Sequence, residues 1–230
     1  MNRKRDQNGT ETILRERDHE KSLVLNVLVT AFGAFPGAPS NPTIALARAL
    51  ERRHGERFAR LSIALHIRVL PVRFAQVEAA LAMALDEVQP DVVLHLGLAG
   101  RRAALCVETR ALNRLSVLRL DAGQAVAPSR AVTPGAAFQR AARWPAQRIR
   151  AAMDRSAATR LSIDAGDYVC NQTLFLTLSR TRGPTGFIHI PHPRRGGGRR
   201  RPGLDPMVEA VASALLVMAG AARLGRSAVA

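Results

Sequence analysis

The chain has 230 residues, 47% hydrophobic and only 4% aromatic, so we expect one large core built mainly from Leu, Val, Ile and Ala. Its two cysteines, Cys106 and Cys170, exclude a disulfide framework and favour a reducing, cytoplasmic setting. The net charge of +16 suggests nucleic-acid binding, but the basic residues are nearly all arginine and are spread along the chain. We attribute the charge to a compositional bias and predict no nucleic-acid partner.

Residues 1–22 are charged and lack the apolar run of a secretory signal, so we interpret them as a disordered leader. No stretch approaches the ~20 continuous apolar residues of a membrane span, which predicts no membrane partner. A single domain is therefore expected over residues 23–230. The densest basic run, residues 194–201, contains three consecutive glycines and is predicted to be a mobile loop.

The first half of this domain alternates strands and helices. Residues 23–30 form an almost continuous apolar run, typical of a strand buried on both faces of a parallel sheet. A Gly- and Pro-rich loop follows over residues 31–43. Amphipathic helices are predicted over residues 43–53 and 74–88, and strands over 61–72 and 91–97. This alternation predicts a three-layer α/β/α sandwich with a mostly parallel central sheet.

The second half is less regular. An extended segment is predicted over residues 104–112, a loop over 115–134, and a helix over 136–153 that is bent at Pro145. A short strand over 161–164 precedes a helix over 171–179, and residues 186–190 form an apolar strand. The last helix is expected over 205–223. Sites in such sheets form at the carboxyl ends of the strands, and we expect the functional site there.

Cys170 is the candidate nucleophile. It follows an extended segment where a helix is expected to begin, and a helix N-terminus lowers a thiol pKa and offers N–H groups to an oxyanion. A buried structural cysteine is the alternative interpretation. A thiol nucleophile needs a base, and His189 in the strand over 186–190 is the candidate, although it also suits a core position. His95, in mid-strand, and His192, in a loop, compete for this role.

A carboxylate is needed to orient the histidine and to support an imidazolium. Glu108 is the candidate, because it follows closely after the glycines that end a predicted strand. A surface ion pair with Arg110 is the alternative, and Asp164 and Asp167 also suit the orienting role. The cysteines and histidines show no zinc-type ligand spacing, so we predict no metal site.

Four segments carry a resemblance to a known family. They are residues 30–43 (TAFGAFPGAPSNPT), residues 97–113 around Glu108, residues 164–171 (DAGDYVCN) around Cys170, and residues 186–191 (GFIHIP) around His189. Their sequence, order and spacing resemble the pyroglutamyl peptidase I (pyrrolidone-carboxylate peptidase) family. These enzymes are cysteine omega-peptidases that remove an N-terminal pyroglutamate from peptides. The resemblance covers the chain from residue 23 to the C-terminal helix.

The resemblance implies a role for each matching residue. Cys170 is implied to be the nucleophile, His189 the general base and acid, and Glu108 the group that orients His189. Phe32 and Phe35 are implied to sandwich the flat pyrrolidone ring. The remaining implied substrate-binding residues are Asn41, Leu98, Tyr168 and Val169. The implied reaction uses a thioacyl intermediate and no cofactor, and the family's assemblies imply a homodimer or homotetramer.

The sequence also departs from the family pattern near the implied pocket. Leu98 stands where the family has glutamine, Thr109 replaces the arginine after Glu108, and residues 118–121 are the only remnant of a family loop. These changes keep two other hypotheses open: a diverged homologue with an altered substrate, and a non-catalytic binder of a small lactam or amide. Thiol alkylation distinguishes them, since an activated Cys170 reacts faster than Cys106 near neutral pH.

Overall fold

A computed structural model describes residues 24–194 and 201–227. The predicted leader, residues 1–22, and most of the arginine-rich run lie outside the described residues. At the centre is a six-stranded sheet with the strand order β2-β1-β3-β8-β4-β7, in which β4 and β7 run antiparallel to the other four. The strands are β1 (Leu25–Phe32), β2 (Ile63–Leu70), β3 (Val92–Leu98), β4 (Leu105–Glu108), β7 (Thr159–Ser162) and β8 (Thr185–Ile190). The predicted mostly parallel sheet is confirmed.

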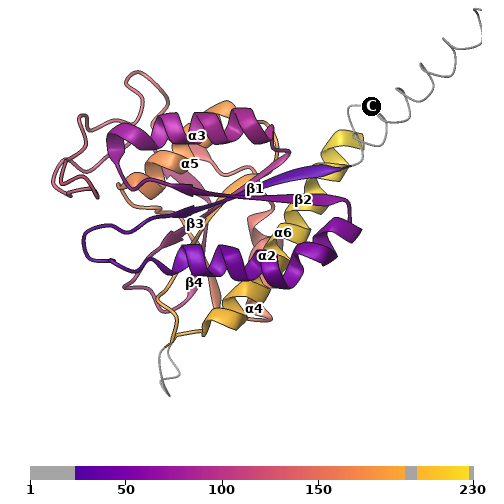
Figure 1. The fold of residues 1–230 in the computed structure, drawn as a ribbon. Coiled ribbons are helices and arrows are strands. Elements are labelled where there is room, and N and C mark those ends of the chain that lie inside the picture. Colours follow the sequence, from indigo (N-terminus) through magenta and orange to yellow (C-terminus); the bar gives the residue numbers. More distant parts are fainter. Residues whose placement is uncertain (1–23, 195–200, 228–230) are drawn as a thin grey trace, which may run out of the picture.

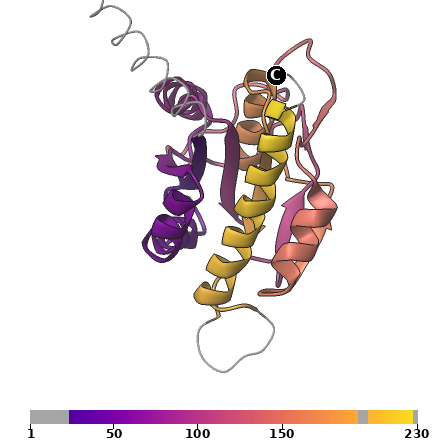
Figure 2. The same ribbon diagram turned by 90° about the vertical axis from the view of Figure 1, so that its right-hand side faces the viewer.

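Helices cover both faces of this sheet (Figure 1). The helices α3 (Phe74–Val88) and α5 (Val169–Arg180) lie on one face. The helices α2 (Pro42–Arg60), α4 (Ala146–Asp154) and α6 (Leu204–Ser227) lie on the other. Figure 2 shows α6 running along the sheet between α2 and α4. The prediction of a three-layer α/β/α sandwich is therefore confirmed.

Strand β1 shows why the apolar runs become central strands. Successive side chains of a strand point to opposite faces of the sheet. Val27 and Val29 therefore pack in the core beneath α2 and α6, whereas Leu28 and Phe32 pack in the core beneath α3 and α5. Each of these side chains is at most 2% exposed. A strand between two helical layers needs apolar residues on both faces, as the sequence provides.

Helix α6 is long and apolar enough to cross a membrane by length and composition alone, with a mean hydropathy of 1.6. In the structure it is a core helix. Met207, Val211, Leu215 and Met218 are buried against the sheet, in the same core as β1 and α2. Its hydropathy is explained by this packing, since a core helix of a globular domain needs the same apolar residues.

The turn between β1 and α2 is held by a small polar network. Asn41 caps α2 by accepting a hydrogen bond from Thr43 N at 3.2 Å, and its Nδ2 donates to Gly33 O at 3.0 Å. Thr43 Oγ1 accepts from Phe32 N at 3.1 Å, which ties the end of β1 to the start of α2. Pro42 suits the first helical position, where no N–H is required. The loop after β1, which carries Phe35, is thus anchored at both ends.

The predicted helix over residues 136–153 is wrong in its first half. Residues Gln139–Ala141 form β6, which pairs antiparallel with β5 (Arg110–Leu112), and α4 begins only at Ala146. Pro145 has no N–H to continue a helix and its ring clashes with the preceding turn, so the helix begins after it instead of bending at it. The predicted extended segment 104–112 is likewise two strands, broken at Thr109, whose N–H donates to Ser162 O at 2.7 Å.

Candidate active site

The candidate site lies at the edge of the sheet where the sequence predicts it. This edge is formed by the carboxyl ends of β3 and β8 and by the first turn of α5. In the sheet, His189 on β8 pairs with Gly97 on β3 and, on its other side, with Cys106 on β4. Cys170 is the second residue of α5, two positions after the N-cap residue Tyr168. Three segments that are far apart in sequence therefore meet around His189, as the resemblance implied.

Glu108 holds the imidazole of His189. Its Oε1 lies 2.8 Å from His189 Nδ1 and also accepts a hydrogen bond from Arg102 Nη1 at 2.7 Å. The Glu108 side chain is completely buried, and its Oε2 has no partner among the described residues. Trp144 Nε1 donates to the backbone carbonyl of Glu108 at 3.2 Å, which fixes this position of β4. A His189 tautomer with hydrogen on Nδ1 leaves Nε2 free to accept a proton.

The other candidates for the orienting carboxylate do not reach the histidine. Asp164 pairs with Arg114 at 3.4 Å and Asp167 with Arg119 at 3.6 Å, and both side chains are partly or largely exposed. The predicted alternative for Glu108, a surface ion pair with Arg110, is wrong. Among the three acidic residues considered, the structure brings only Glu108 to His189.

His95 is a structural histidine. It is completely buried on β3, where its Nδ1 lies 2.7 Å from Thr30 Oγ1 and its Nε2 lies 2.9 Å from Thr177 Oγ1. Burial lowers the pKa of His95 to about 3, so its imidazole stays neutral in the folded protein. Both ring nitrogens are occupied by threonine hydroxyls, and His95 therefore cannot act as the base.

The thiol of Cys170 lies over β3. A Cβ placed on Gly97 would be 3.0 Å from Cys170 Sγ and 2.5 Å from Cζ of Phe187, so the absence of a side chain at Gly97 makes room for both groups. The ring of Phe187 lies 4.6 Å, centroid to centroid, from that of His189. The thiol, the aromatic ring and the imidazole are thus packed together above a glycine.

The electrostatics of Cys170 differ from the prediction. Burial raises the pKa of its thiol to about 12, Glu108 adds to this shift, and the charge of Arg119 opposes it. The expected lowering by the N-terminus of α5 is outweighed, because loss of solvent penalises a thiolate more than the helix dipole favours it. No hydrogen bond joins Cys170 Sγ to His189 in the part of the chain that the structure describes.

A cavity of about 750 Å³ opens onto this group. Its lining includes both Cys170 and His189, and it is closed by residues from the loop after β1, the end of β3 and the 115–134 loop. Phe32, Phe35 and Tyr168 supply aromatic walls, and the rings of Phe35 and Tyr168 are 5.9 Å apart. Arg101, Arg102, Arg119 and Asp164 also line the cavity, so aromatic and charged side chains share its walls. The aromatic part of the wall suits a small, flat, uncharged ring.

The predicted pocket residues are placed as follows. Phe32, Phe35, Asn41, Leu98 and Tyr168 line the cavity. Asn41 also uses its side-chain oxygen to cap α2 and its amide to bind Gly33, so it shapes the loop as well as the wall. Val169, by contrast, is completely buried in the core beneath α3 and α5 and lies behind the wall. Its position next to Cys170 on α5 turns it away from the cavity.

Two arginines of the site were not given roles by the sequence. Arg102 binds Glu108 and also donates to Asp164 O at 2.9 Å. Arg119 lies with its guanidinium 4.6 Å from the centre of the Tyr168 ring and lines the cavity. A basic residue six positions before Glu108 was the available signal for the first, but so many arginines in the chain hide it.

The loop that carries Arg119 is anchored by a buried carboxylate. Asp121 is 2% exposed and accepts hydrogen bonds from Phe74 N at 2.9 Å, Gly123 N at 2.7 Å and Ala125 N at 3.1 Å. Tyr168 also donates from its hydroxyl to Leu120 O at 2.8 Å. The segment that the sequence showed as a remnant of a family loop is therefore fixed against the pocket.

The fold is a three-layer α/β/α sandwich, and its candidate site groups a cysteine, a histidine and a buried glutamate at one edge of the sheet. Within the described residues, no group of three or more His, Cys, Asp or Glu side chains could hold a metal ion. The family model described as pyroglutamyl peptidase matches residues 25–218.

Individual relatives agree with the family model. A pyrrolidone-carboxylate peptidase of Pyrococcus furiosus is 32% identical over 73% of this chain and 81% of its own. One of Pseudomonas fluorescens is 32% identical over 83% and 91%. The solved pyrrolidone carboxyl peptidase of Thermococcus litoralis superposes with a TM-score of 0.75 at 27% identity, covering 86% of this chain and 94% of that one. This chain belongs to the pyroglutamyl peptidase family.

Proposed function

We propose that this protein removes N-terminal pyroglutamate from peptides with Cys170 as nucleophile, His189 as general base and acid, and Glu108 as the group that positions His189. The observation that carries this proposal is the convergence of the three residues. Cys170 and His189 line one cavity, and Glu108 lies 2.8 Å from His189 on the side away from it. Membership of the family supports the substrate class.

The geometry supports a sequence of proton transfers. Since the Cys170 thiol is protonated at neutral pH, His189 Nε2 takes its proton as the sulfur attacks the pyroglutamyl carbonyl. The imidazolium is supported by Glu108 through Nδ1. His189 then gives the proton to the leaving amine, and a thioacyl ester remains on Cys170. Water activated by His189 hydrolyses this ester, which releases pyroglutamate and restores the thiol.

The pyrrolidone ring is proposed to lie among Phe32, Phe35 and Tyr168. The lactam is flat and uncharged, and it lacks the ammonium group of an ordinary peptide N-terminus. Aromatic walls therefore stabilise it without an acidic partner. Leu98 offers no side-chain hydrogen bond, so the polar contacts of the lactam fall to backbone groups at the end of β3.

The test is hydrolysis of a pyroglutamyl aminocoumarin amide by the wild-type protein and two matched cysteine variants. Cys170→Ser is expected to lower kcat/KM by about 10⁴-fold or more, because loss of the nucleophile removes the covalent route. Cys106→Ala changes the other cysteine, which is buried outside the cavity and contacts Arg102, and is expected to lower kcat/KM by no more than about tenfold, far less than Cys170→Ser. Full activity of Cys170→Ser, with both variants folded by circular dichroism, would refute the mechanism.

The remaining expectations from the sequence, the cytoplasmic location and the oligomeric state, belong to this proposal too. Cys106 and Cys170 are both free thiols in the structure, which supports a reducing, cytoplasmic environment. A homodimer or homotetramer stays a prediction, and light scattering of the full chain measures it directly.

A further inference from the structure

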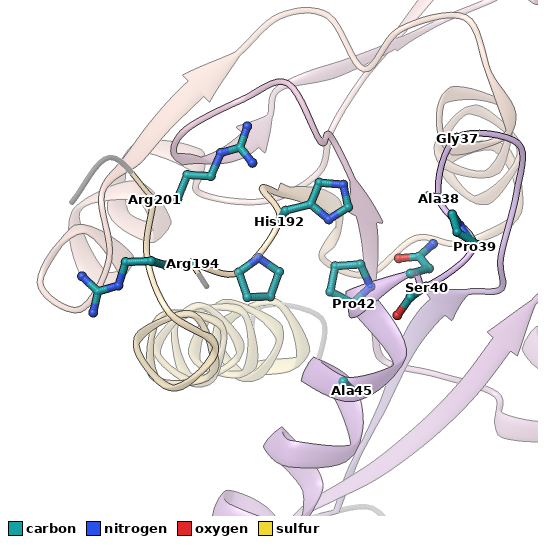
Figure 3. A pocket seen from close by; sticks show the side chains of 11 residues that line it. Gly37, Ala38, Pro39, Ser40, Pro42, Ala45, His192, Arg194 and Arg201 are labelled. Atoms are coloured by element: carbon teal, nitrogen blue, oxygen red, sulfur yellow. The ribbon is translucent and has the colours of Figure 1, made fainter. Parts of the chain in front are cut away.

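A second cavity of about 810 Å³ adjoins the catalytic one. The two share Gly37, Ala38, Asn41 and His192 in their walls, and they are separated by the turn before α2 and by the segment after β8. In Figure 3, His192 and Arg201 border the cavity on one side and the residues from Gly37 to Pro42 border it on the other. The shared residues place the second cavity directly beside the one that contains Cys170 and His189.

The walls of this cavity carry only positive charge. Arg194 and Arg201 are the charged residues among the eleven that line it, and none of the eleven is acidic. In the described part of the chain, neither arginine forms an ion pair with a carboxylate. The guanidinium of Arg201 has five N–H donors, and one of them binds Gly100 O at 2.9 Å. Arg201 therefore keeps unneutralised N–H donors at this cavity, whereas Figure 3 shows the Arg194 side chain pointing away from His192 and Pro42, at the rim.

The wall that contains His192 and Arg201 also contacts the catalytic cavity through Gly100. A Cβ on Gly100 would lie 2.9 Å from His192 Nε2, so the histidine packs directly on this glycine, and Arg201 binds its carbonyl oxygen. Gly100 itself lines the catalytic cavity. The backbone N–H of Arg194 donates to Pro202 O at 3.0 Å, which holds the two ends of the arginine-rich run together at the rim. A charge in this cavity thus lies beside the path to Cys170.

A third cavity, of about 420 Å³, is the alternative exit. It shares Arg102 and Asp164 with the catalytic cavity. Its charged lining residues are Arg102, Arg160 and Asp164, and Arg102 is already neutralised by Glu108. The carboxylate of Asp164 makes this wall less positive than that of the second cavity, so an acidic peptide is attracted more strongly to the second cavity.

We infer that the cavity lined by His192, Arg194 and Arg201 binds the residues that follow pyroglutamate in the substrate, and that it selects peptides with an acidic side chain at the first or second of these positions. The inference rests on the proposed peptidase function and adds a substrate preference to it. The carboxylate binds the guanidinium of Arg201, with Arg194 farther out at the rim. Pro39, Pro42 and Pro193 give the peptide backbone a rigid, apolar wall.

The experiment compares two pairs of peptides that differ only in charge: pyroglutamyl-Glu-Ala-amide with pyroglutamyl-Gln-Ala-amide, and pyroglutamyl-Ala-Glu-amide with pyroglutamyl-Ala-Gln-amide. At low salt the wild-type protein is expected to show a kcat/KM about 3- to 10-fold higher for the acidic member of at least one pair. Raising the salt to ~1 M is expected to bring this ratio towards one, because exposed charges are screened.

Arg201→Gln and Arg194→Gln are the test variants, and Arg148→Gln on the exposed surface of α4 is the control that changes net charge equally. The acidic-to-neutral ratio is expected to fall to about twofold or less in Arg201→Gln, to fall by less in Arg194→Gln and to stay at the wild-type value in Arg148→Gln. Because both peptides of a pair meet the same variant, a general loss of activity leaves the ratio readable.

Two results overturn the inference. One is a wild-type ratio near one for both peptide pairs, and the other is a ratio that survives both arginine changes. Either of these, with normal hydrolysis of the coumarin amide, leaves the proposed peptidase function intact. Failure of the wild-type protein to hydrolyse any pyroglutamyl substrate removes the proposed function itself, and the inference falls with it.

Discussion

Gly97 offers a direct test of how the site is packed. The backbone of β3 is not in the left-handed region at this position, so alanine is conformationally allowed and only its Cβ matters. That atom would lie 2.5 Å from Cζ and 2.6 Å from Cε1 of Phe187, and 3.0 Å from Cys170 Sγ. Carbon atoms in contact normally stand about 3.5–4.0 Å apart, so the ring has to move by about 1 Å.

Such a movement is expected to affect both stability and activity in Gly97→Ala. Overpacking a buried site costs about 1–3 kcal/mol, which corresponds to a fall in Tm of about 2–12 °C for a chain of this size. The ring of Phe187 lies 4.6 Å from His189 and 5.9 Å from His95, so displacement of the ring reaches the imidazole that acts on Cys170. A misplacement of this size costs about 10²-fold in kcat/KM.

Thermal unfolding and hydrolysis of the pyroglutamyl coumarin amide measure the two effects. Gly55→Ala is the matched control, since Gly55 lies inside α2 and a Cβ there would meet nothing within 4 Å. This change is expected to stabilise the protein by about 0.5–1 kcal/mol through helix propensity and to leave activity unchanged. A Gly97→Ala protein with wild-type Tm and activity would show that Phe187 and Cys170 do not occupy the space above Gly97.

Two further predictions concern charge at the site. Arg102→Gln removes the guanidinium that shares Glu108 Oε1 with His189. Because Arg102 acts through the positioning of Glu108, kcat is expected to fall about tenfold or more with little change in KM. Arg148→Gln is the control, and a change confined to KM would contradict this role. The second concerns alkaline stability. The folded protein retains the Cys170 proton up to about pH 12, whereas the unfolded chain loses it near 9.0, so stability falls as pH rises between these values. In urea unfolding at pH 7 and pH 10, wild type is expected to lose ~1 kcal/mol more than Cys170→Ala, and equal losses would show that the thiol is not desolvated.

Much of this fold follows from local sequence patterns. The central strands β1 and β3 carry mostly apolar residues on both faces. A short apolar run of this kind is typical of a strand buried in a parallel sheet. The helix α3 ends at Val88, and its C-cap residue Gln89 has a left-handed conformation before Pro90, as the proline predicts. The positions of Cys170 and His189 at element ends made them candidates, but their roles and that of Glu108 were implied only by the resemblance of four segments to a known family.

The antiparallel pairing of β5 with β6 could not be found in this way. Its strands are three residues each, and the alanines around Gln139–Ala141 favour a helix locally. Pairing with Arg110–Leu112, nearly thirty residues earlier, decides the outcome. A non-local backbone pairing of this kind leaves no periodic signal in so short a segment.

The raised pKa of Cys170 also could not be predicted from the neighbouring sequence. The sequence places the thiol at a helix N-terminus and so predicts an activated thiolate. The degree of burial depends on Phe187 and on the absence of a side chain at Gly97, which belong to two other strands. Desolvation is a property of the packed site, and only the structure supplies it.

The protonated thiol makes the arrangement around Glu108 decisive for the proposed mechanism. Without a preformed thiolate, His189 has to take the proton during the attack, and its charge then appears next to a carboxylate that is completely buried. Arg102 and His189 both bind Oε1, while Oε2 has no partner among the described residues. The neutral imidazole therefore shares one oxygen with a full positive charge. When it becomes an imidazolium, its bond to Glu108 strengthens, and the stabilisation falls on the step at which sulfur becomes nucleophilic.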